Sequence, residues 1–142
     1  MAKTKVLLVE DSDIAINIYE KMINSSRHLE VVGKAKDGKE GLNLVSQLNP
    51  DVICTDLQMP HMSGLEFTKQ VMAHYPTPIL VLSNSVQKTD VDNIYEVMKA
   101  GAVDVMAKPQ TALGGSSESM QNELIVKIRV LATKKVSAIP LS

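Results

Sequence analysis

The chain has 142 residues, enough for one domain with a proper core but not comfortably for two. Its 15 basic and 16 acidic residues give a formal charge of −1, without the basic excess that is typical of nucleic-acid binding. The single cysteine, Cys54, allows no internal disulfide, and no apolar run is long enough for a signal peptide or a membrane span. We therefore expect a cytoplasmic protein that contacts neither nucleic acid nor membrane directly.

The first apolar run, Lys5 to Val9, predicts a short strand that ends at two acids, Glu10 and Asp11. Ser12 or Asp13 can cap the helix that follows. Two apolar strips have helical spacing in that helix, namely Ile14, Ile18 and Met22, and Ile16, Tyr19 and Ile23. A helix with two such strips is expected to contact more than the sheet.

A second strand is predicted over Glu30 to Ala35, and Asp37-Gly38 turns the chain into a helix that ends at Asn49-Pro50. The apolar positions of this helix are Leu42, Leu44, Val45 and Leu48. Val52 to Thr55 is then a short apolar run, bounded by turn residues on both sides. It predicts a buried strand with Asp56 at its tip.

The next helix is marked by Leu65, Val71 and Met72 and stops before Pro76. Ile79 to Leu82 is the clearest buried strand of the chain, and it ends at Ser83.

Thr89 or Asp90 is then expected to cap a helix that ends at Gly101. Its inward positions are predicted to be Val91, Ile94, Tyr95 and Met98. Ala102 to Ala107 predicts a fifth strand that runs into Lys108-Pro109.

A polar segment containing Gly114 to Ser117 separates the fifth strand from a last helix. One side of that helix carries Met120, Leu124, Ile128 and Leu131. Val126 and Val130 lie on its opposite side, where they suit either a small contact site or ordinary scattered surface apolar residues. Lys134 to Ser142 has no periodicity and reads as a linker.

Strands that alternate with helices, and that are apolar throughout, favour a parallel sheet covered on both faces. Five such repeats predict an α/β domain with a doubly wound, five-stranded parallel sheet, flavodoxin-like with strand order 2-1-3-4-5. In such sheets the functional crevice forms at the carboxyl ends of the strands, so Glu10, Asp11, Asp56, Ser83 and Lys108 should converge there.

Three acids that meet at one edge need a counter-charge. Two carboxylates about 4 Å apart repel by roughly 4 kcal/mol at an effective dielectric near 20. A magnesium ion prefers oxygen ligands and leaves coordination positions open for a phosphate oxygen. With the metal and Lys108 facing it, Asp56 could accept a phosphoryl group, and Ser83 could donate a hydroxyl to it.

Each of these residues also has an ordinary explanation. Glu10-Asp11 could be loop acids before a helix cap, Ser83 a turn residue and Lys108 a surface lysine. Acids, a hydroxyl and an amine follow four strand ends together. This combination favours phosphoryl transfer onto a carboxylate over a separate explanation for each residue.

The same residues carry a family resemblance. The motifs are Val9-Glu10-Asp11-Ser12, Asp56-Leu57-Gln58-Met59-Pro60 with Ser63-Gly64, Leu82-Ser83, and Lys108-Pro109. Together they resemble the receiver domain of two-component response regulators, from about Lys5 to the last helix near Thr133. We expect residues 1–134 to form this domain and residues 135–142 to begin an interdomain linker.

The resemblance implies that a sensor histidine kinase phosphorylates Asp56. It also implies that Asp11, Asp56 and the backbone carbonyl of Gln58 bind Mg²⁺, that Glu10 assists through water, and that Lys108 contacts the phosphoryl group. The Lys108-Pro109 bond would be cis. Val105 departs from the family pattern, in which an aromatic residue is frequent at that position.

Within the family the chain looks most like the receiver of the chemotaxis protein-glutamate methylesterase. The supporting pieces are Pro76-Thr77-Pro78, Leu82-Ser83 and Gly101-Ala102-Val103-Asp104 before Lys108-Pro109. No Gly-x-Ser-x-Gly elbow is present, so this chain is expected to be regulatory and not an enzyme. It would switch an output surface and regulate a methylesterase domain outside it.

Three alternatives remain at this stage. One is a stand-alone receiver or the receiver of a DNA-binding regulator. Another is a phosphohydrolase that passes through an aspartyl phosphate, against which Gln58 stands where such enzymes carry a second acid. The third is a receiver-like scaffold that binds partners without phosphorylation, against which the complete set of acids argues.

Overall fold

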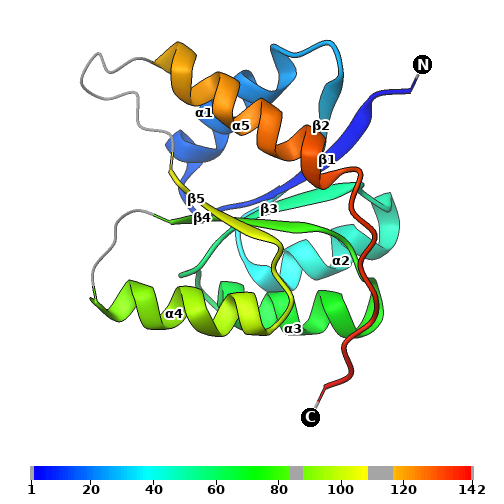
Figure 1. The fold of residues 1–142 in the computed structure, drawn as a ribbon, viewed down its shortest axis with the longest axis vertical. Coiled ribbons are helices and arrows are strands. Elements are labelled where there is room, and N and C mark those ends of the chain that lie inside the picture. The colour runs from blue at the N-terminus through cyan, green and yellow to red at the C-terminus, as the bar shows by residue number, and fades with distance from the viewer. Residues whose placement is uncertain (1, 84–87, 109–116, 142) are drawn as a thin grey trace.

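A single sheet of five parallel strands, in the order β2-β1-β3-β4-β5, forms the centre of the protein. The computed structural model describes residues 2–83, 88–108 and 117–141. The fold prediction is confirmed, including the strand order (Figure 1). The strands are β1 (Thr4–Val9), β2 (Leu29–Ala35), β3 (Val52–Asp56), β4 (Ile79–Ser83) and β5 (Asp104–Ala107).

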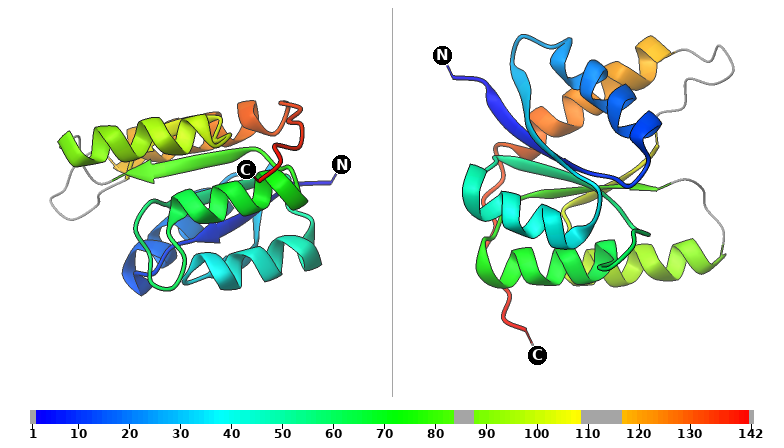
Figure 2. Two further views of the ribbon diagram at one scale, coloured as in Figure 1. Left: turned by 90° about the horizontal axis from the view of Figure 1, so that it is seen from below. Right: turned by 180° about the vertical axis from the view of Figure 1, so that it is seen from behind.

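Helices cover both faces of this sheet, as its apolar strands require. One face carries α1 (Asp13–Asn24) and α5 (Ser117–Leu131), and the other carries α2 (Gly38–Leu48), α3 (Gly64–His74) and α4 (Lys88–Lys99) (Figure 2). The two apolar layers differ in their helical partners. Tyr19 and Ile128 pack in the layer under α1 and α5, whereas Phe67 and Val97 pack in the layer over α2, α3 and α4.

Side-chain caps fix where three of the helices begin. Ser12 accepts a hydrogen bond from the backbone N–H of Ala15, and Asp37 caps α2 in the same way. Ser63 caps α3. These contacts satisfy N–H groups that have no partner inside the helix, so the cap residues place the helix starts next to the strand ends.

Two helix faces differ from the prediction. Ile14 is 77% exposed, because α1 turns its other strip, together with Met22 of the first strip, into the core. Tyr95 is 65% exposed, and Met98 is also on the surface.

In α4 the buried position is Val97, with Ile94 half-buried one turn before it, so the inward stripe is rotated from the predicted one. The helix also begins at Lys88, ahead of the residues Thr89 and Asp90 that were predicted to cap it.

The fifth strand begins at Asp104, later than the predicted start at Ala102. Gly101 has φ 122, and the N–H of Ala102 donates to the carbonyl of Val97 at 3.1 Å. Ala102 therefore belongs to the closing turn of α4, and only after that turn does the chain join the sheet.

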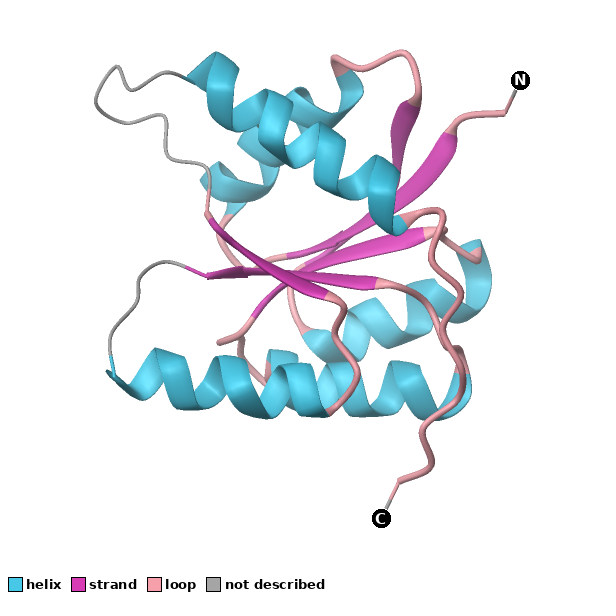
Figure 3. Ribbon diagram, viewed as in Figure 1, coloured by secondary structure: helices cyan, strands magenta, loops and turns pink. Residues whose placement is uncertain are grey.

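The predicted faces of α5 are confirmed where the structure describes them: Leu124 and Ile128 are buried, and Val126 and Val130 are exposed. Residues 135–141 form neither helix nor strand and run from α5 to α3, across to the opposite helical layer (Figure 3). Within the described ranges, no helix has the length and apolar character needed to cross a bilayer.

Candidate functional site

The register of the strands brings the predicted residues to one edge of the sheet. Val9 pairs with Thr55, so Glu10, directly after β1, lies beside Asp56 at the end of β3. On the other side of β3, Asp56 pairs with Leu82, which places Ser83 at the same edge. The carboxyl ends of parallel strands necessarily share an edge, and this edge is where the crevice of such a sheet forms.

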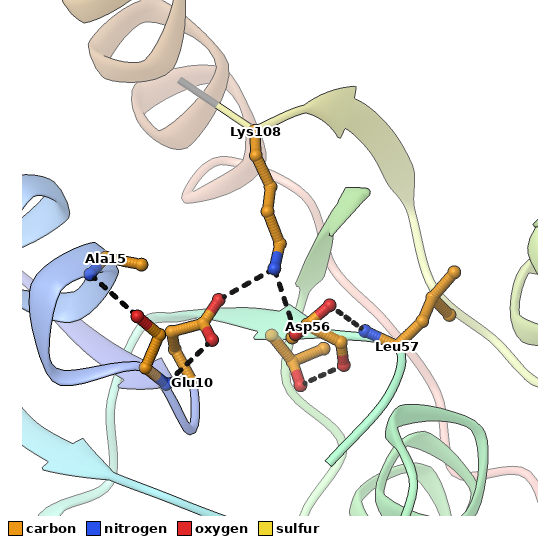
Figure 4. A network of polar contacts seen from close by, with 7 residues as sticks. Glu10, Ala15, Asp56, Leu57 and Lys108 are labelled. Carbon is orange, nitrogen blue, oxygen red and sulfur yellow. Dashed lines mark hydrogen bonds and ion pairs between the residues drawn. The ribbon is translucent and has the colours of Figure 1, made fainter. Parts of the chain in front are cut away.

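Lys108 lies at the centre of the polar network (Figure 4). It follows β5, where its N–H donates to the carbonyl of Ser83 at 2.8 Å. Its ammonium group donates to Asp56 Oδ2 at 3.0 Å and lies 3.1 Å from Glu10 Oε1. All three side chains are largely buried, at 10%, 12% and 3% exposure for Lys108, Asp56 and Glu10. One cation thus joins two acids that come from different strands.

The two oxygens of the Asp56 carboxylate have different partners. Oδ1 accepts a hydrogen bond from the N–H of Leu57 at 2.7 Å, and Oδ2 accepts from Lys108. The backbone of Asp56 is also held, because the Thr55 hydroxyl donates to its carbonyl oxygen at 2.9 Å. A Cβ on Gly64 would lie only 2.2 Å from that same oxygen, so the loop after β3 can close on Asp56 only because residue 64 is glycine. The acid is therefore fixed in position.

Glu10 is the most buried acid of the site. Its Oε2 accepts a hydrogen bond from the N–H of Ser12 at 3.0 Å, which joins it to the start of α1. Its Oε1 is near Lys108 but is not aligned for a hydrogen bond with any described residue, so this buried oxygen has only the ion pair. Burial raises the pKa of Glu10 above its usual range, and the charge of Asp56 adds to the effect.

Asp11 completes a cluster of three acids with Glu10 and Asp56. Ligand oxygens of the three lie within 4.8 Å of one another, and Asp11 is exposed to solvent. A hard divalent cation fits this set, because the donors are all carboxylate oxygens, one of the acids is open to water, and Glu10 Oε1 has no hydrogen-bond partner among the described residues. Asp11 and Asp56 are thus suitable ligands for Mg²⁺, with Glu10 beside them.

The surroundings of Lys108 favour its charged form. Burial by itself would lower the pKa of its ammonium group. The hydrogen bond and charge of Asp56, together with those of Glu10, outweigh burial and raise the pKa above its ordinary value. Lys108 therefore stays positively charged at any physiological pH.

Ser83 and Gln58 complete the predicted set. Ser83 is buried at the end of β4, next to the Lys108 backbone. Gln58 is exposed in the loop after β3, and the metal-binding role of its carbonyl stays a prediction. The predicted cis bond involves Pro109, which lies outside the described residues, as does the polar segment before α5.

Several contacts at the site were not foreseen in the sequence. The backbone N–H groups of Leu57 and Ser12 hold two of the acids, and backbone donors leave no signal in a side-chain pattern. Tyr19 lies buried in the layer below. Burial, and the charges of Glu10 and Asp56, raise the pKa of its hydroxyl far above the usual range, so it stays neutral.

Comparison with known proteins gives one consistent family. The response regulator receiver domain matches residues 6–113. The chain is 39% identical over 136 residues to a protein-glutamate methylesterase/protein-glutamine glutaminase of Methanococcus maripaludis, covering 96% of this chain and 37% of that protein. A relative of the same name from Sulfurimonas denitrificans is 34% identical over 94% of this chain and 38% of its own length. The chain thus spans little more than a third of these relatives.

Solved structures agree with this comparison. The response regulator domain of Thermotoga maritima CheB superposes with a TM-score of 0.82 at 32% identity, covering 94% of this chain and 99% of that one. The chemotaxis protein CheY4 of Vibrio cholerae has a TM-score of 0.73 at 28% identity, over 92% of this chain and 99% of its own.

Proposed function

The chain belongs to the response regulator receiver domain family, and we propose that Asp56 is its phosphoacceptor, with Mg²⁺ as the cofactor and a sensor histidine kinase as the donor. The observation that carries this proposal is the position of Asp56 Oδ2, 3.0 Å from the buried ammonium group of Lys108 and within a cluster of three acids. The domain is regulatory and not itself a catalytic domain.

Each side chain has a separate part in the transfer. A carboxylate oxygen of Asp56 attacks the phosphorus of a phosphohistidine, an O–P bond forms while the P–N bond breaks, and the imidazole leaves with the electron pair. Lys108 pairs with Asp56 before the reaction and with the phosphoryl oxygens after it, and Ser83 donates its hydroxyl to one of those oxygens. Mg²⁺, when bound, offsets the negative charge that gathers on the transferring group.

Glu10 and Asp11 prepare the site. Asp11 and Asp56 would be the carboxylate ligands for the metal, and the backbone carbonyl of Gln58 would be the third protein ligand. Glu10 is held by Ser12 and Lys108 and would assist the metal through water. Because the acids repel one another, a bound cation would offset their charge. Phosphorylation adds negative charge to the same site, and the cation and Lys108 would balance it.

The new charge then acts on a surface made by α4, β5 and α5. A shift of a two-state equilibrium from 1:99 to 99:1 needs about 5.5 kcal/mol of differential interaction. Contacts of the phosphoryl group with Lys108 and Ser83, which lie at the ends of β5 and β4, are the source we propose. Val105 on β5 takes the place of the aromatic residue that is frequent in the family, so the switch works without an inward ring movement.

We infer further that the output is a protein-glutamate methylesterase activity in the cytoplasm. The support is the name shared by the relatives, their identity over nearly the whole of this chain, and the larger size of those proteins. On this proposal residues 1–134 are the receiver and 135–142 begin the connection to the catalytic domain.

Mass spectrometry after incubation with Mg²⁺ and an acyl phosphate tests the phosphoacceptor role. The chain should gain one phosphoryl group, and the gain should be lost in Asp56→Asn and without Mg²⁺. Glu123→Gln, at an exposed acid on α5, is the control and should be phosphorylated normally. Full phosphorylation of Asp56→Asn would refute the proposal.

A further inference from the structure

We propose that residues 135–141 form a strap that is seated on the ends of α3 and α4 farthest from the site, and that phosphorylation of Asp56 loosens it. The coupling to phosphorylation rests on the phosphoacceptor role proposed above. The seat itself rests on contacts within the chain.

The strap is attached by its backbone and by side chains. The N–H of Ile139 donates to the carbonyl of Met72, near the end of α3, at 2.9 Å. Val136 packs, partly buried, against the apolar layer over α2, α3 and α4. Since α5 lies on the other face of the sheet, the strap joins the two helical layers (Figure 1). A segment that only led away from the domain would make neither contact.

The strap also meets the end of α4. Gly101, just beyond that helix, has φ 122, and a Cβ built on it would lie 2.8 Å from Met72 Cγ and 2.9 Å from Ile139 Cδ1. The ends of α3 and α4 and the strap therefore touch at one point with no spare room. A displacement of Gly101 must disturb the position of Ile139.

A cleft lies beside this point. It has a volume of about 490 Å³ and lies between α3 and α4, with Ile139, Pro140 and Leu141 forming one wall. Lys69 and Lys99 are among the residues from the two helices that line it. The strap is thus packed against the domain on one side and borders open space on the other.

The helix α4 connects this point with the site. Its 12 residues span about 18 Å. It lies between Ser83, at the edge where Asp56 is held, and Gly101, at the strap. Among residues 92–99 only Val97 is buried, so the sheet holds α4 lightly and the contacts at Gly101 are an important anchor. Elements with little buried surface are the ones that move at low cost.

The proposed direction of the effect is release of the strap. They fit the form in which Asp56 is unmodified. A phosphoryl group that draws Ser83 toward it biases the start of α4, and a stiff helix carries that bias to Gly101. The contact with Ile139 is then lost, and its N–H is released from Met72. Couplings between two sites in proteins are commonly about 5- to 150-fold.

Hydrogen exchange of single amides, followed by NMR, tests the strap. The Ile139 N–H should be protected in the free chain and should exchange at least about tenfold faster with Mg²⁺ and beryllofluoride, a mimic of the phosphoryl group. The N–H of Lys108, bonded to Ser83, reports on the site in the same spectra.

Because coupling is reciprocal, weakening the strap should tighten beryllofluoride binding by the same factor. Ile139→Pro removes the donor, and Ile139→Ala keeps it but removes the packing on Gly101, so the gain should be larger for proline. Lys21→Ala, at an exposed position on α1 and outside the surface made by α4, β5 and α5, is the control and should bind as the parent does.

The outcomes separate the two proposals. An unprotected Ile139 amide in the free chain would refute the binding of residues 135–141 to the ends of α3 and α4. A shift at Lys108 with no change in Ile139 exchange, or an unchanged affinity in Ile139→Pro, would overturn the coupling and leave the phosphoacceptor role standing. No response at Lys108 to beryllofluoride would remove the phosphoacceptor role and the coupling together.

Discussion

Replacing Lys108 with methionine removes the cation from the centre of the site while keeping a side chain of similar length. The ammonium group lies 3.0 Å from Asp56 Oδ2 and 3.1 Å from Glu10 Oε1, and the side chains of all three residues are at most 12% exposed. Lys108→Met therefore leaves two buried acids facing each other.

The size of the loss can be worked from this geometry. Unit charges 3 Å apart attract by about 5.5 kcal/mol at an effective dielectric of 20, and the burial of the ammonium group cancels part of that gain. Removing one partner from a buried ion pair typically costs about 3–5 kcal/mol. We expect the free energy of unfolding of Lys108→Met to fall by about this amount at pH 8 without Mg²⁺.

The loss should depend on pH in a defined direction. Burial already raises the pKa of Glu10 above its ordinary value of 4.5, and this pKa rises further when Lys108 is removed. The folded variant then keeps a proton that the unfolded chain has lost, so its stability falls as the pH rises from 4.5 through the folded pKa. The deficit should be smaller at about pH 5 than at about pH 8, and Mg²⁺ should narrow it.

Urea unfolding at both pH values, with and without Mg²⁺, measures these differences. Lys127→Met is the matched control, because Lys127 pairs with Asp104 at 2.9 Å but the two side chains are 29% and 44% exposed. Such an exposed pair contributes about 0–1 kcal/mol. A deficit for Lys108→Met no larger than that of Lys127→Met would refute the reasoning.

Three further predictions concern β3 and the loop after it. Gly64→Ala places a Cβ 2.2 Å from the carbonyl oxygen of Asp56 and should lower the free energy of unfolding by about 3 kcal/mol, measured by urea titration. An unchanged free energy of unfolding would mean that the loop relaxes around the added carbon. Burial raises the pKa of the Cys54 thiol from 9.0 to about 12, so the folded chain keeps a proton that the unfolded chain loses, and stability should fall over that range. Cys54→Ala should show a shallower fall, and equal slopes would contradict burial as the cause. Gln58→Ala, at an exposed position, should change the rate of phosphate release from Asp56 without changing stability, and an unchanged rate would remove Gln58 from the mechanism.

The strand ends were predictable because their signal is local. An apolar run that stops at Asp56 or Ser83 marks both the strand and its tip, and the topology of a parallel sheet then places the tips together. The sequence therefore indicated which acids meet and that Lys108 faces them. It did not indicate that the N–H groups of Leu57 and Ser12 hold the acids, because every residue except proline carries such a donor.

The helix faces were less predictable. In α1 both apolar strips satisfy helical spacing, and only the packing against the sheet and α5 decides that Ile14 is the exposed one. In α4 Tyr95 and Met98 fit an inward stripe as well as Ile94 and Val97 do. The helical period gives the relative positions of side chains on a helix. The rotation of the helix about its own axis is set by contacts with distant residues.

Residues 135–141 show the same limit in another form. Their sequence has no periodicity, because the segment is held by one backbone hydrogen bond at Ile139 and by packing of Val136. Neither contact requires a repeating pattern. The contact can be recognised only in the folded chain, where Met72 lies beside Ile139.

The residues of the site follow separate strands, so the site can react only when the whole domain has folded. Glu10 follows the first strand and Lys108 the last, and no short stretch of chain contains both. Contacts between residues so far apart in sequence form only when the intervening loops have been closed. During synthesis, Asp56 would emerge well before the lysine that faces it. An incomplete or misfolded chain therefore has Asp56 without the residues that allow its phosphorylation. A chain that can be phosphorylated is thus one that has folded completely.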